Sequence, residues 1–581
     1  MLSPTKEKIQ ANNLENLNGG EIVIEFLKAN GYSHIFGIPG RKILPFYDTA
    51  YQRGGIEMVV TMHEQGGSYM ATCFSHMNDK GCCAGMTGPG TMNLLNGVAA
   101  AYADSIPLLV FGGQVPVDTT GKYAIQESTG IGRTPNQMKI FETVTKCATR
   151  VERIEDLLSI LEKTYKTIHT GRKGPGFIEI PQNILSETIA INPKKFAIDL
   201  EEESKNSLPI ANVEEIDKAI DLLHSAQNPI ILLGNGASLS EAEEIAQKFI
   251  EYTNIPFTTS LPAKGLITED HDLALGCIGI WGQKTSNDYM LNKADVILAV
   301  GTTFQELSTL GWRSFQGKKV IRIDLDKNEI NRNCNAEVAI LSDAKAALEM
   351  IYDRIHYQEI SFFHLNGMKE VVRSQKDKFG YYETFKLDEY PAYDNGKIPA
   401  YEVLIDLGKM RNPNDVLVFD AGENAYFSQF LIKSFSKKTY IVNAGLGSMG
   451  FAAAGSVGVN FACPDRNVIA VVGDGGFLMN GNEMATAAHH NKKVIWCVLN
   501  NGILGTQKHY QRDYCEGRYI GCYMPEVDIT SYAKSMGIDA VTIHKIEEFH
   551  SEFDSALKGD KSKVLNIIIC DETSPKPPFF F

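Results

Sequence analysis

A carboxylate and an amide side chain follow two consecutive apolar runs near the end of the chain. Asp474 comes soon after the run 468–472, and Asn501 follows the run 494–499. Such runs are typical of buried parallel strands, and the segment 483–490 between them has helical character. Parallel strands joined by a crossover helix end at the same edge of a sheet. We therefore expect Asp474 and Asn501 to lie close together at that edge.

The chemistry available at this edge is that of hard oxygen ligands. A carboxylate, an amide oxygen and a backbone carbonyl suit Mg²⁺ or Ca²⁺, and the phosphate oxygens of a ligand can complete the octahedron. The string GDGG at 473–476 predicts a sharp glycine turn, because glycine allows positive φ and exposes backbone N–H groups to a ligand. GDG alone is also an ordinary hairpin turn, so the prediction of a metal and phosphate site depends on the whole stretch.

The GDGG string and the string NNG at 500–502, at this spacing, resemble the motif of enzymes that depend on thiamine diphosphate (ThDP). The resemblance implies Mg²⁺ held by Asp474, Asn501 and the backbone carbonyl of Ile503. It also implies that the N–H groups of Gly475 and Gly476 donate hydrogen bonds to the pyrophosphate of the cofactor. The cofactor-binding residues implied in this half of the site are Asp474, Gly475, Gly476, Asn501, Ile503 and Leu504.

Three segments carry the resemblance into the first part of the chain: GIPG at 37–40, HEQGG at 63–67 and TGPGTMN at 87–93. A lone glutamate at a strand end is ordinarily a solvated carboxylate or a helix cap. In the ThDP family a glutamate in this position contacts the aminopyrimidine ring, which implies that role for Glu64. A buried carboxylate against a ring nitrogen favours ring protonation and the reactive imino tautomer. The other residues implied here are Gly40, Pro89 and Asn93.

Two further strings add residues to the predicted site. GLGSMG resembles the family segment whose backbone contacts the aminopyrimidine, which implies contacts from Gly447 and Ser448. Met449 would wedge between the two rings of ThDP and keep the cofactor bent; its other interpretation is core filler. Gln126, in the string AIQE, matches a polar residue that faces the substrate-derived intermediate, and a plain loop glutamine is the alternative. The predicted catalytic residues are thus Glu64 and Gln126.

Composition limits the classes of protein that remain. The chain has 581 residues, of which 44% are hydrophobic and 22% charged, as in globular proteins with large cores. A net charge of −14 argues against binding to nucleic acid or to anionic membranes. The 11 cysteines include no CxxC pair, so the sequence predicts neither a zinc site nor a disulfide framework. No apolar run reaches transmembrane length and no signal peptide is evident, so we expect no membrane partner and a cytoplasmic location.

Apolar runs that end in glycine turns alternate with helical patterns along the chain. This alternation predicts an α/β protein with three doubly wound parallel-sheet domains. In the order of the family these are a pyrimidine-binding domain over 1–190, a central domain over 191–365 and a pyrophosphate- and metal-binding domain over 366–581. We expect residues 1–18 to form a loose arm and the aromatic linker 355–398 to form a surface strap.

Within the family the chain most resembles the acetohydroxyacid (acetolactate) synthase and pyruvate oxidase branch. The resemblance implies decarboxylation of a 2-oxo acid, with pyruvate favoured, and transfer of the resulting enamine to a carbonyl acceptor. The alternatives are a decarboxylase that releases an aldehyde and a flavin-linked oxidase; a non-catalytic nucleotide-binding protein is a remote alternative. The family also implies a homodimer or homotetramer with active sites between subunits.

Several strings depart from that branch. The stretch 301–306 lacks the arginine-rich flavin loop, so FAD is possible but not favoured in the central domain, and GNGAS at 234–238 indicates a packing turn. Tyr510 stands where the branch has a tryptophan that lines the acceptor pocket. We expect Gln507 and Lys508 to meet a polar or anionic acceptor.

Two more observations bear on the alternatives. The region 113–130 contains no histidine, which argues against the decarboxylases that use a histidine pair there. The terminal string KPPFFF is expected to cover an active site, to dock on a partner subunit or to fray.

Overall fold

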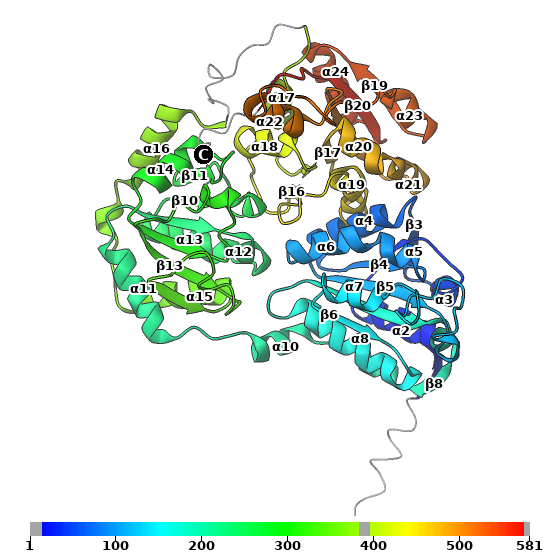
Figure 1. Cartoon of the computed structure of the whole chain (residues 1–581). Helices are drawn as coiled ribbons and strands as arrows, with labels where there is room; N and C mark the ends of the chain where they lie inside the picture. The colour runs from blue at the N-terminus through cyan, green and yellow to red at the C-terminus, as the bar shows by residue number, and fades with distance from the viewer. Residues whose placement is uncertain (1–13, 383–395, 575–581) are drawn as a thin grey trace, which may run out of the picture.

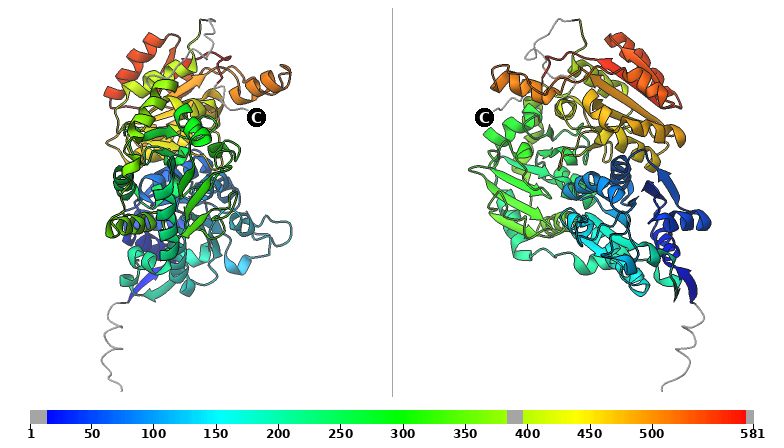
Figure 2. Two further views of the ribbon diagram at one scale, coloured as in Figure 1. Left: turned by 90° about the vertical axis from the view of Figure 1, so that its left-hand side faces the viewer. Right: turned by 45° about the vertical axis from the view of Figure 1, so that its right-hand side comes forward.

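Three parallel six-stranded sheets form the framework of the protein. The computed structural model describes residues 14–382 and 396–574. In Figure 1 the first and third sheets, with their helices, lie one above the other, and the central sheet lies beside both; Figure 2 shows the same arrangement from two other sides. The predicted α/β class with three doubly wound parallel-sheet domains is confirmed.

The first sheet has the strand order β3-β2-β4-β5-β7-β6, with all neighbours parallel. Its strands are β2 (His34–Gly37), β3 (Glu57–Val60), β4 (Gly81–Gly85), β5 (Leu108–Gln114), β6 (Cys147–Arg150) and β7 (Pro175–Pro181). Its helices are α2 (Gly19–Ala29), α3 (Leu44–Arg53), α4 (Glu64–Asn78), α5 (Pro89–Asn93), α6 (Leu95–Ala103), α7 (Gln137–Glu142), α8 (Ile154–His169) and α9 (Gln182–Ser186). The apolar stripe of α2 is buried, and the helix ends at Ala29, followed by the cap residue Asn30 and by Gly31 at positive φ.

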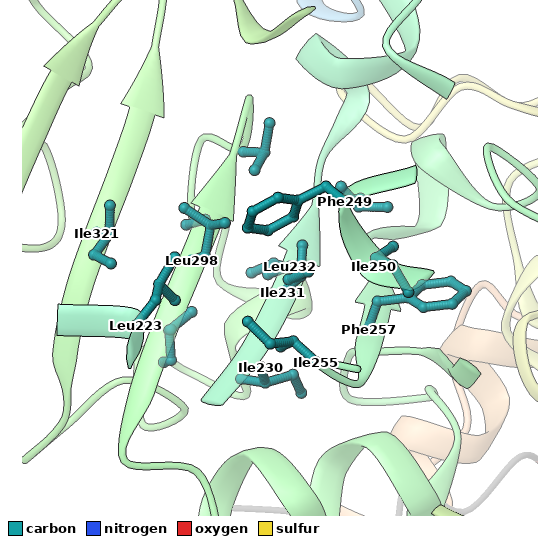
Figure 3. Close-up of a cluster of buried hydrophobic side chains, with 14 of the residues drawn as sticks. Leu223, Ile230, Ile231, Leu232, Phe249, Ile250, Ile255, Phe257, Leu298 and Ile321 are labelled. Atoms are coloured by element: carbon teal, nitrogen blue, oxygen red, sulfur yellow. The ribbon is translucent and has the colours of Figure 1, made fainter. Parts of the chain in front are cut away.

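The central sheet has the order β11-β10-β9-β12-β13-β14, which is the doubly wound order of dinucleotide-binding folds. Its strands are β9 (Pro229–Leu233), β10 (Phe257–Thr259), β11 (Ala274–Cys277), β12 (Val296–Val300), β13 (Lys319–Asp324) and β14 (Val338–Leu341). The helices from the linker onward are α10 (Leu200–Ser207), α11 (Val213–Ser225), α12 (Asn235–Leu239), α13 (Glu243–Thr253), α14 (Lys284–Asn292), α15 (Ala344–Tyr357) and α16 (Met368–Phe379). Figure 3 shows its core, where Ile231 and Leu232 of β9 lie among the buried side chains that also include Phe249.

The third sheet, β16-β15-β17-β18-β20-β19, repeats the topology of the first. Its strands are β15 (Val416–Phe419), β16 (Tyr440–Val442), β17 (Val468–Gly473), β18 (Val494–Asn500), β19 (Asp539–Ile543) and β20 (Lys563–Ile568). Its helices are α17 (Ala400–Met410), α18 (Glu423–Leu431), α19 (Phe451–Ala462), α20 (Asp474–Asn480), α21 (Met484–His489), α22 (Gly505–Tyr514), α23 (Ile529–Ser535) and α24 (Ile546–Lys558). The predicted strand–helix–strand unit around Asp474 is therefore present.

Helices α4 and α19 join the first and third domains into one packed body (Figure 1). A Cβ atom placed on Gly458 of α19 would lie 2.1 Å from the carbonyl oxygen of Met70 on α4, so only glycine allows this approach. Side chains of both domains, among them Phe74 and Val457, share one buried cluster. The two domains of one chain are thus fixed to each other by apolar packing.

One expectation about connecting segments is wrong for the residues that the structure describes. Strand β1 (Glu15–Asn18) pairs antiparallel with β8 (Thr188–Ile191), so the end of the expected loose arm is part of a two-stranded sheet. The segment expected to form a surface strap contains the helix α16, and Tyr381 and Tyr382 at the end of its described part are buried. The rest of the aromatic stretch, 383–395, and the KPPFFF tail lie outside the described residues. In the part of the chain that is described, no helix is long and apolar enough to cross a membrane.

Candidate active site

A cavity of about 260 Å³ lies at the carboxyl-terminal edge of the third sheet. It is lined by Gly473 at the end of β17, by Leu499 near the end of β18, and by residues of the segments that follow β15, β17 and β18. The predicted site residues that line it are Gly447, Met449, Asp474, Gly475, Gly476, Asn501, Ile503 and Leu504. The structure therefore brings together residues that lie as much as 57 positions apart (504 − 447) in the sequence.

Asp474 and Asn501 face the same cavity because β17 and β18 are parallel neighbours in register. Oδ2 of Asp474 accepts a hydrogen bond from the N–H of Gly502 at 3.1 Å, and Oδ1 of Asn501 accepts one from the N–H of Ile503 at 3.2 Å. Burial raises the pKa of Asp474 to about 6. A bound cation would favour the charged carboxylate and reverse that shift.

The oxygen atoms that line this cavity fit a hard cation that is coordinated by the protein and by a phosphate together. No cluster of three His, Cys, Asp or Glu side chains in the described residues could hold a metal alone. A divalent ion would therefore use Asp474, the amide oxygen of Asn501, the carbonyl of Ile503 and oxygens from a ligand. In the same cavity Oδ1 of Asn424 is buried and has no hydrogen-bond partner, which leaves an acceptor open to a ligand.

The expected glycine turn at 473–476 is wrong, because α20 begins directly at Asp474. Gly475 and Gly476 are helical, and neither has positive φ. Their role is close approach: a Cβ atom on Gly476 would lie 1.9 Å from Oδ2 of Asp420. On Gly475 it would lie 3.0 Å from Cδ2 of Leu504, at the wall of the cavity. Glycine here leaves room for neighbouring groups and a ligand rather than for an unusual backbone.

The GLGSMG loop is held by carboxylates that the sequence did not single out. Asp420, at the end of β15, accepts hydrogen bonds from the N–H groups of Gly450 and Ala452 at 2.9 and 3.2 Å. Asp104 of the first domain accepts one from the N–H of Gly445 at 2.8 Å. Ser448 does not line the cavity, since its hydroxyl donates to Asn96 at 3.0 Å. The loop therefore presents Met449 to the cavity while both domains hold its backbone.

Glu64 lies at the first position of α4 and is 7% exposed. Its Oε2 accepts a hydrogen bond from the amide of Asn93 at 2.9 Å, so two of the predicted residues are in contact. The backbone just before it is anchored by Glu483 of the third domain, which accepts the N–H groups of Met62 and His63 at 3.1 and 2.9 Å. Glu483 is not among the residues predicted from the sequence. Burial raises the pKa of its carboxyl group.

Gln126 projects from an exposed loop that follows β5 and has φ of +63°. Its neighbour Glu127 is buried and accepts N–H groups from Gly121 and Ala124, which fixes the loop. The carbonyl of Gln126 lies against Gly88, the residue before Pro89. A Cβ atom placed on Gly88 would lie 3.2 Å from that carbonyl oxygen. These hydrogen bonds explain how a non-glycine residue is held in a left-handed conformation.

Gly40 packs against Met86, where a Cβ atom would lie 2.4 Å from Cβ of Met86. Met86 also lies beside Gly90, and Gly90 lies beside Glu64. The residues predicted in the first domain are therefore neighbours around the carboxyl-terminal edge of the first sheet. None of them lines the 260 Å³ cavity of the third domain, so one chain presents two separate groups of predicted site residues.

Helix α22 changes one expectation about the acceptor. Lys508 is buried, and its ammonium group bonds to the carboxylates of Asp571 and Glu572 at 2.7 and 2.8 Å, so the expectation that it meets an acceptor is wrong. Gln507 does line the cavity. Tyr510 is 60% exposed and does not line it. The sequence analysis also missed Glu423, a cavity residue that only the fold brings near the metal motif.

A second cavity, of about 440 Å³, lies where the three domains meet. Its walls include Gly236 and Thr302 of the central domain, Arg172 and Lys173 of the first and Tyr426 of the third. The GNGAS string forms the start of α12, and a Cβ atom on Gly234 would lie 2.2 Å from the carbonyl oxygen of Gly301. The string is thus a site of close packing, as predicted, and also borders this cavity.

Family models match all three domains of the chain. The N-terminal TPP binding domain of thiamine pyrophosphate enzymes matches residues 17–137, the central domain 216–351 and the C-terminal TPP binding domain 420–567. The chain therefore belongs to the thiamine pyrophosphate enzyme family, and thiamine diphosphate is its cofactor.

Within that family the chain is similar to acetolactate synthase large subunits. A probable acetolactate synthase large subunit of Methanococcus aeolicus is 32% identical over 563 residues, 95% of this chain and 92% of its own length. The acetolactate synthase large subunit of Buchnera aphidicola subsp. Schizaphis graminum is 32% identical over 94% of this chain and 93% of its own length. The acetolactate synthase isozyme 3 large subunit of Escherichia coli (strain K12) is 29% identical over 94% of this chain and 93% of its own length. The predicted resemblance to this branch is confirmed.

Proposed function

We propose that the protein decarboxylates pyruvate and joins the remaining two-carbon unit to a carbonyl acceptor, as the name acetolactate synthase implies for its relatives. The observation that carries the proposal is the convergence of Met449, Asp474 and Asn501 on one cavity in a chain that matches those relatives over nearly its whole length. The flavin-linked oxidase and the aldehyde-releasing decarboxylase are the alternatives within the same chemistry.

The cavity of the third domain would hold Mg²⁺ and the diphosphate. Asp474, Asn501 and the carbonyl of Ile503 would bind the metal, and the N–H groups of Gly475 and Gly476 would meet phosphate oxygens. When bound, ThDP supplies the carbon nucleophile that attacks the carbonyl of a 2-oxo acid and allows CO2 to leave. Met449 would hold the cofactor bent, a role that its position in the cavity wall supports.

Glu64 would hold a proton at the aminopyrimidine ring, and Asn93 would orient its carboxylate through the hydrogen bond already present. A buried carboxylate can hold a proton at a ring nitrogen because little water competes for the hydrogen bond. Gln126 would contact the substrate from its exposed loop. Gln507, in the cavity wall, is the residue that we assign to the acceptor.

We propose that the two groups of site residues meet across a homodimer. In the left view of Figure 2, helix α22, in orange, and the light-blue loop that follows β5 project on the same side of the molecule. Both carry exposed apolar side chains, among them Ile125 (74% exposed) near Gln126, and Tyr510 and Ile520 on and after α22. Exposed apolar groups of this size favour burial by a partner.

We further propose that the 440 Å³ cavity takes a nucleotide, with FAD as the candidate known from the family. The cavity lies at the carboxyl-terminal edge of a sheet with the dinucleotide-binding strand order. Its walls carry the basic residues Arg172 and Lys173 together with three aspartates, Asp104, Asp324 and Asp343. Extraction of the purified protein tests this. A released nucleotide supports the proposal, its visible spectrum shows whether it is a flavin, and a protein that neither carries nor binds any nucleotide overturns it.

Product analysis tests the main proposal. Protein loaded with Mg²⁺ and ThDP is given pyruvate, and CO2 and organic products are measured together. We expect one acetolactate for each CO2, because one pyruvate serves as donor and a second as acceptor. Acetaldehyde in place of acetolactate would contradict the carboligase assignment and favour the decarboxylase, and a flavin-dependent uptake of oxygen would favour the oxidase.

A further inference from the structure

A carboxylate that the motif does not include lies in the wall of the cofactor cavity. Glu423 is the first residue of α18 and lines the same 260 Å³ cavity as Asp474 and Asn501. A Cβ atom on Gly505 would lie 2.7 Å from Oε2 of Glu423, so this carboxylate rests against bare backbone just after the metal motif. An unpaired carboxylate in this position would repel a diphosphate.

His509 on α22 is the partner of Glu423. Its Nδ1 lies 2.6 Å from Oε1 of Glu423, and its Nε2 lies 3.0 Å from the carbonyl oxygen of Asp571. A carbonyl oxygen can only accept a hydrogen bond, so Nε2 carries a proton. At 2.6 Å a second proton must lie between Nδ1 and the carboxylate, because two bare lone pairs would repel each other. The Glu423–His509 pair as a whole therefore carries no net charge.

No other cation replaces His509 in this role among the described residues. The side chains that line the cavity include no lysine, arginine or histidine. Lys508, the residue before His509, does not line the cavity and is bonded instead to the carboxylates of Asp571 and Glu572. Without His509, the diphosphate would face two negatively charged carboxylates, those of Asp474 and Glu423. A single Mg²⁺ would then be the only positive charge in the cavity that offsets them.

We propose that His509 is a positioning residue that neutralises Glu423 and so allows the diphosphate of ThDP to occupy the cavity. His509 is 3% exposed and does not line the cavity, so it acts through Glu423 and not by contact with the cofactor. The inference rests on the proposed placement of the diphosphate beside Asp474 and Asn501.

A double-mutant cycle on the full-length protein, stripped of cofactor, tests the inference. The dissociation constant of Mg²⁺–ThDP is measured by isothermal titration for the wild type, His509→Gln, Glu423→Gln and the double variant. His509→Gln keeps a donor for the carbonyl of Asp571 but leaves Glu423 charged, so we expect binding about 10- to 100-fold weaker. In the double variant we expect affinity close to that of the wild type, because the repelling charge is gone.

Two controls make the result specific. His550→Gln removes a histidine that lies 2.7 Å from the carboxylate of Asp406. Neither residue of that pair lines the cavity, so this variant should leave the affinity unchanged. The single variant Glu423→Gln gives a result even if His509→Gln fails to fold. It should bind Mg²⁺–ThDP at least as tightly as the wild type does. A purely structural role for His509 would give the same loss in the single and the double variant.

The outcomes separate this inference from the proposed function. Weak binding by Glu423→Gln, or no recovery in the double variant, overturns the role of His509 while the cavity remains the cofactor site. Asp474→Ala is titrated in parallel. If that variant binds Mg²⁺–ThDP like the wild type, the diphosphate is not in this cavity, and both the inference and the proposed placement are wrong.

Discussion

At the scale of single residues, the contact between Glu64 and Asn93 is the feature of the first domain that most directly concerns catalysis. Glu64 is buried and its carboxylate is oriented by one amide hydrogen bond. A glutamine in its place would keep an acceptor for Asn93 but could not hold the ring proton. We predict that Glu64→Gln lowers kcat by about 10²–10⁴-fold, the range for loss of a general acid or base.

The affinity for Mg²⁺–ThDP should change little in the same variant, because Glu64 does not line the diphosphate cavity. Steady-state kinetics with pyruvate and titration of the cofactor measure the two effects separately. Glu25→Gln, which alters a carboxylate that pairs with Lys28 on α2, is the matched control and should change neither quantity. Full activity in Glu64→Gln would remove Glu64 from the mechanism.

Residue types and spacing predicted that Asp474 and Asn501 come together, because two adjacent parallel strands bring both residues to the same edge of the sheet. They could not predict the Glu423–His509 pair, since those residues come from distant segments that only the fold brings into contact. For Lys508 the sequence suggested a role in the site that the structure does not support. Its charge suggested an anionic substrate, but the carboxylates that neutralise it lie 63 and 64 positions further along the chain, where no local pattern reveals them.

At the scale of elements, the loop between β16 and α19 depends on one buried carboxyl group. Asp420 is fully buried, and although backbone N–H groups donate to it, burial raises its pKa to about 7 from an ordinary 3.8. The folded protein therefore holds a proton on Asp420 at pH values where the unfolded chain has lost it. Stability must fall as the pH rises from about 4 to 7, by at most about 4 kcal/mol from this group.

We predict that wild-type protein loses stability relative to Asp420→Asn over that pH range, as measured by denaturant unfolding of the cofactor-free protein. Asp528 is the control with the opposite sign. It caps α23 at the surface, and the hydrogen bonds from Ser531 lower its pKa, so its contribution is lost only as the pH falls below about 4. A constant difference between wild type and Asp420→Asn from pH 4 to 7 would refute the role of Asp420.

The strands that position the site were predictable because each is a short apolar run followed by glycine or polar residues. The start of α20 was not, since two glycines after Asp474 have low helix propensity and suggest a turn. Packing decides the outcome there: Gly476 fits against Asp420, and any larger residue would clash. Short strands such as β6 and β14 are hard to predict, because four residues are too few for a pattern to stand out from the surrounding sequence.

At the scale of the whole molecule, α4 and α19 lock the first and third domains together, while the two groups of site residues stay apart within a chain. If the site forms between two chains, one chain supplies Glu64 and the other Asp474. We predict that mixing inactive Glu64→Gln chains with inactive Asp474→Asn chains, after dissociation and reassembly, restores activity. Each mixed dimer then contains one site with both native residues.

The same mixture distinguishes the two arrangements of the site. If Glu64 and Asp474 of the same chain formed each site, every site in a mixed dimer would carry one substitution and no activity would return. Reassembly of each variant with itself is the control and should stay inactive in both cases. The activity of the mixture against the proportion of the two chains is the quantity to measure.

The most direct test of the account is titration of Mg²⁺–ThDP into cofactor-stripped wild-type protein and into Asp474→Ala, followed by pyruvate in the same cell with detection of CO2. We predict tight binding and CO2 release for the wild type, and loss of both in Asp474→Ala. Binding of Mg²⁺–ThDP by Asp474→Ala as tightly as by the wild type, or a loaded wild type that releases no CO2 from pyruvate, would contradict it.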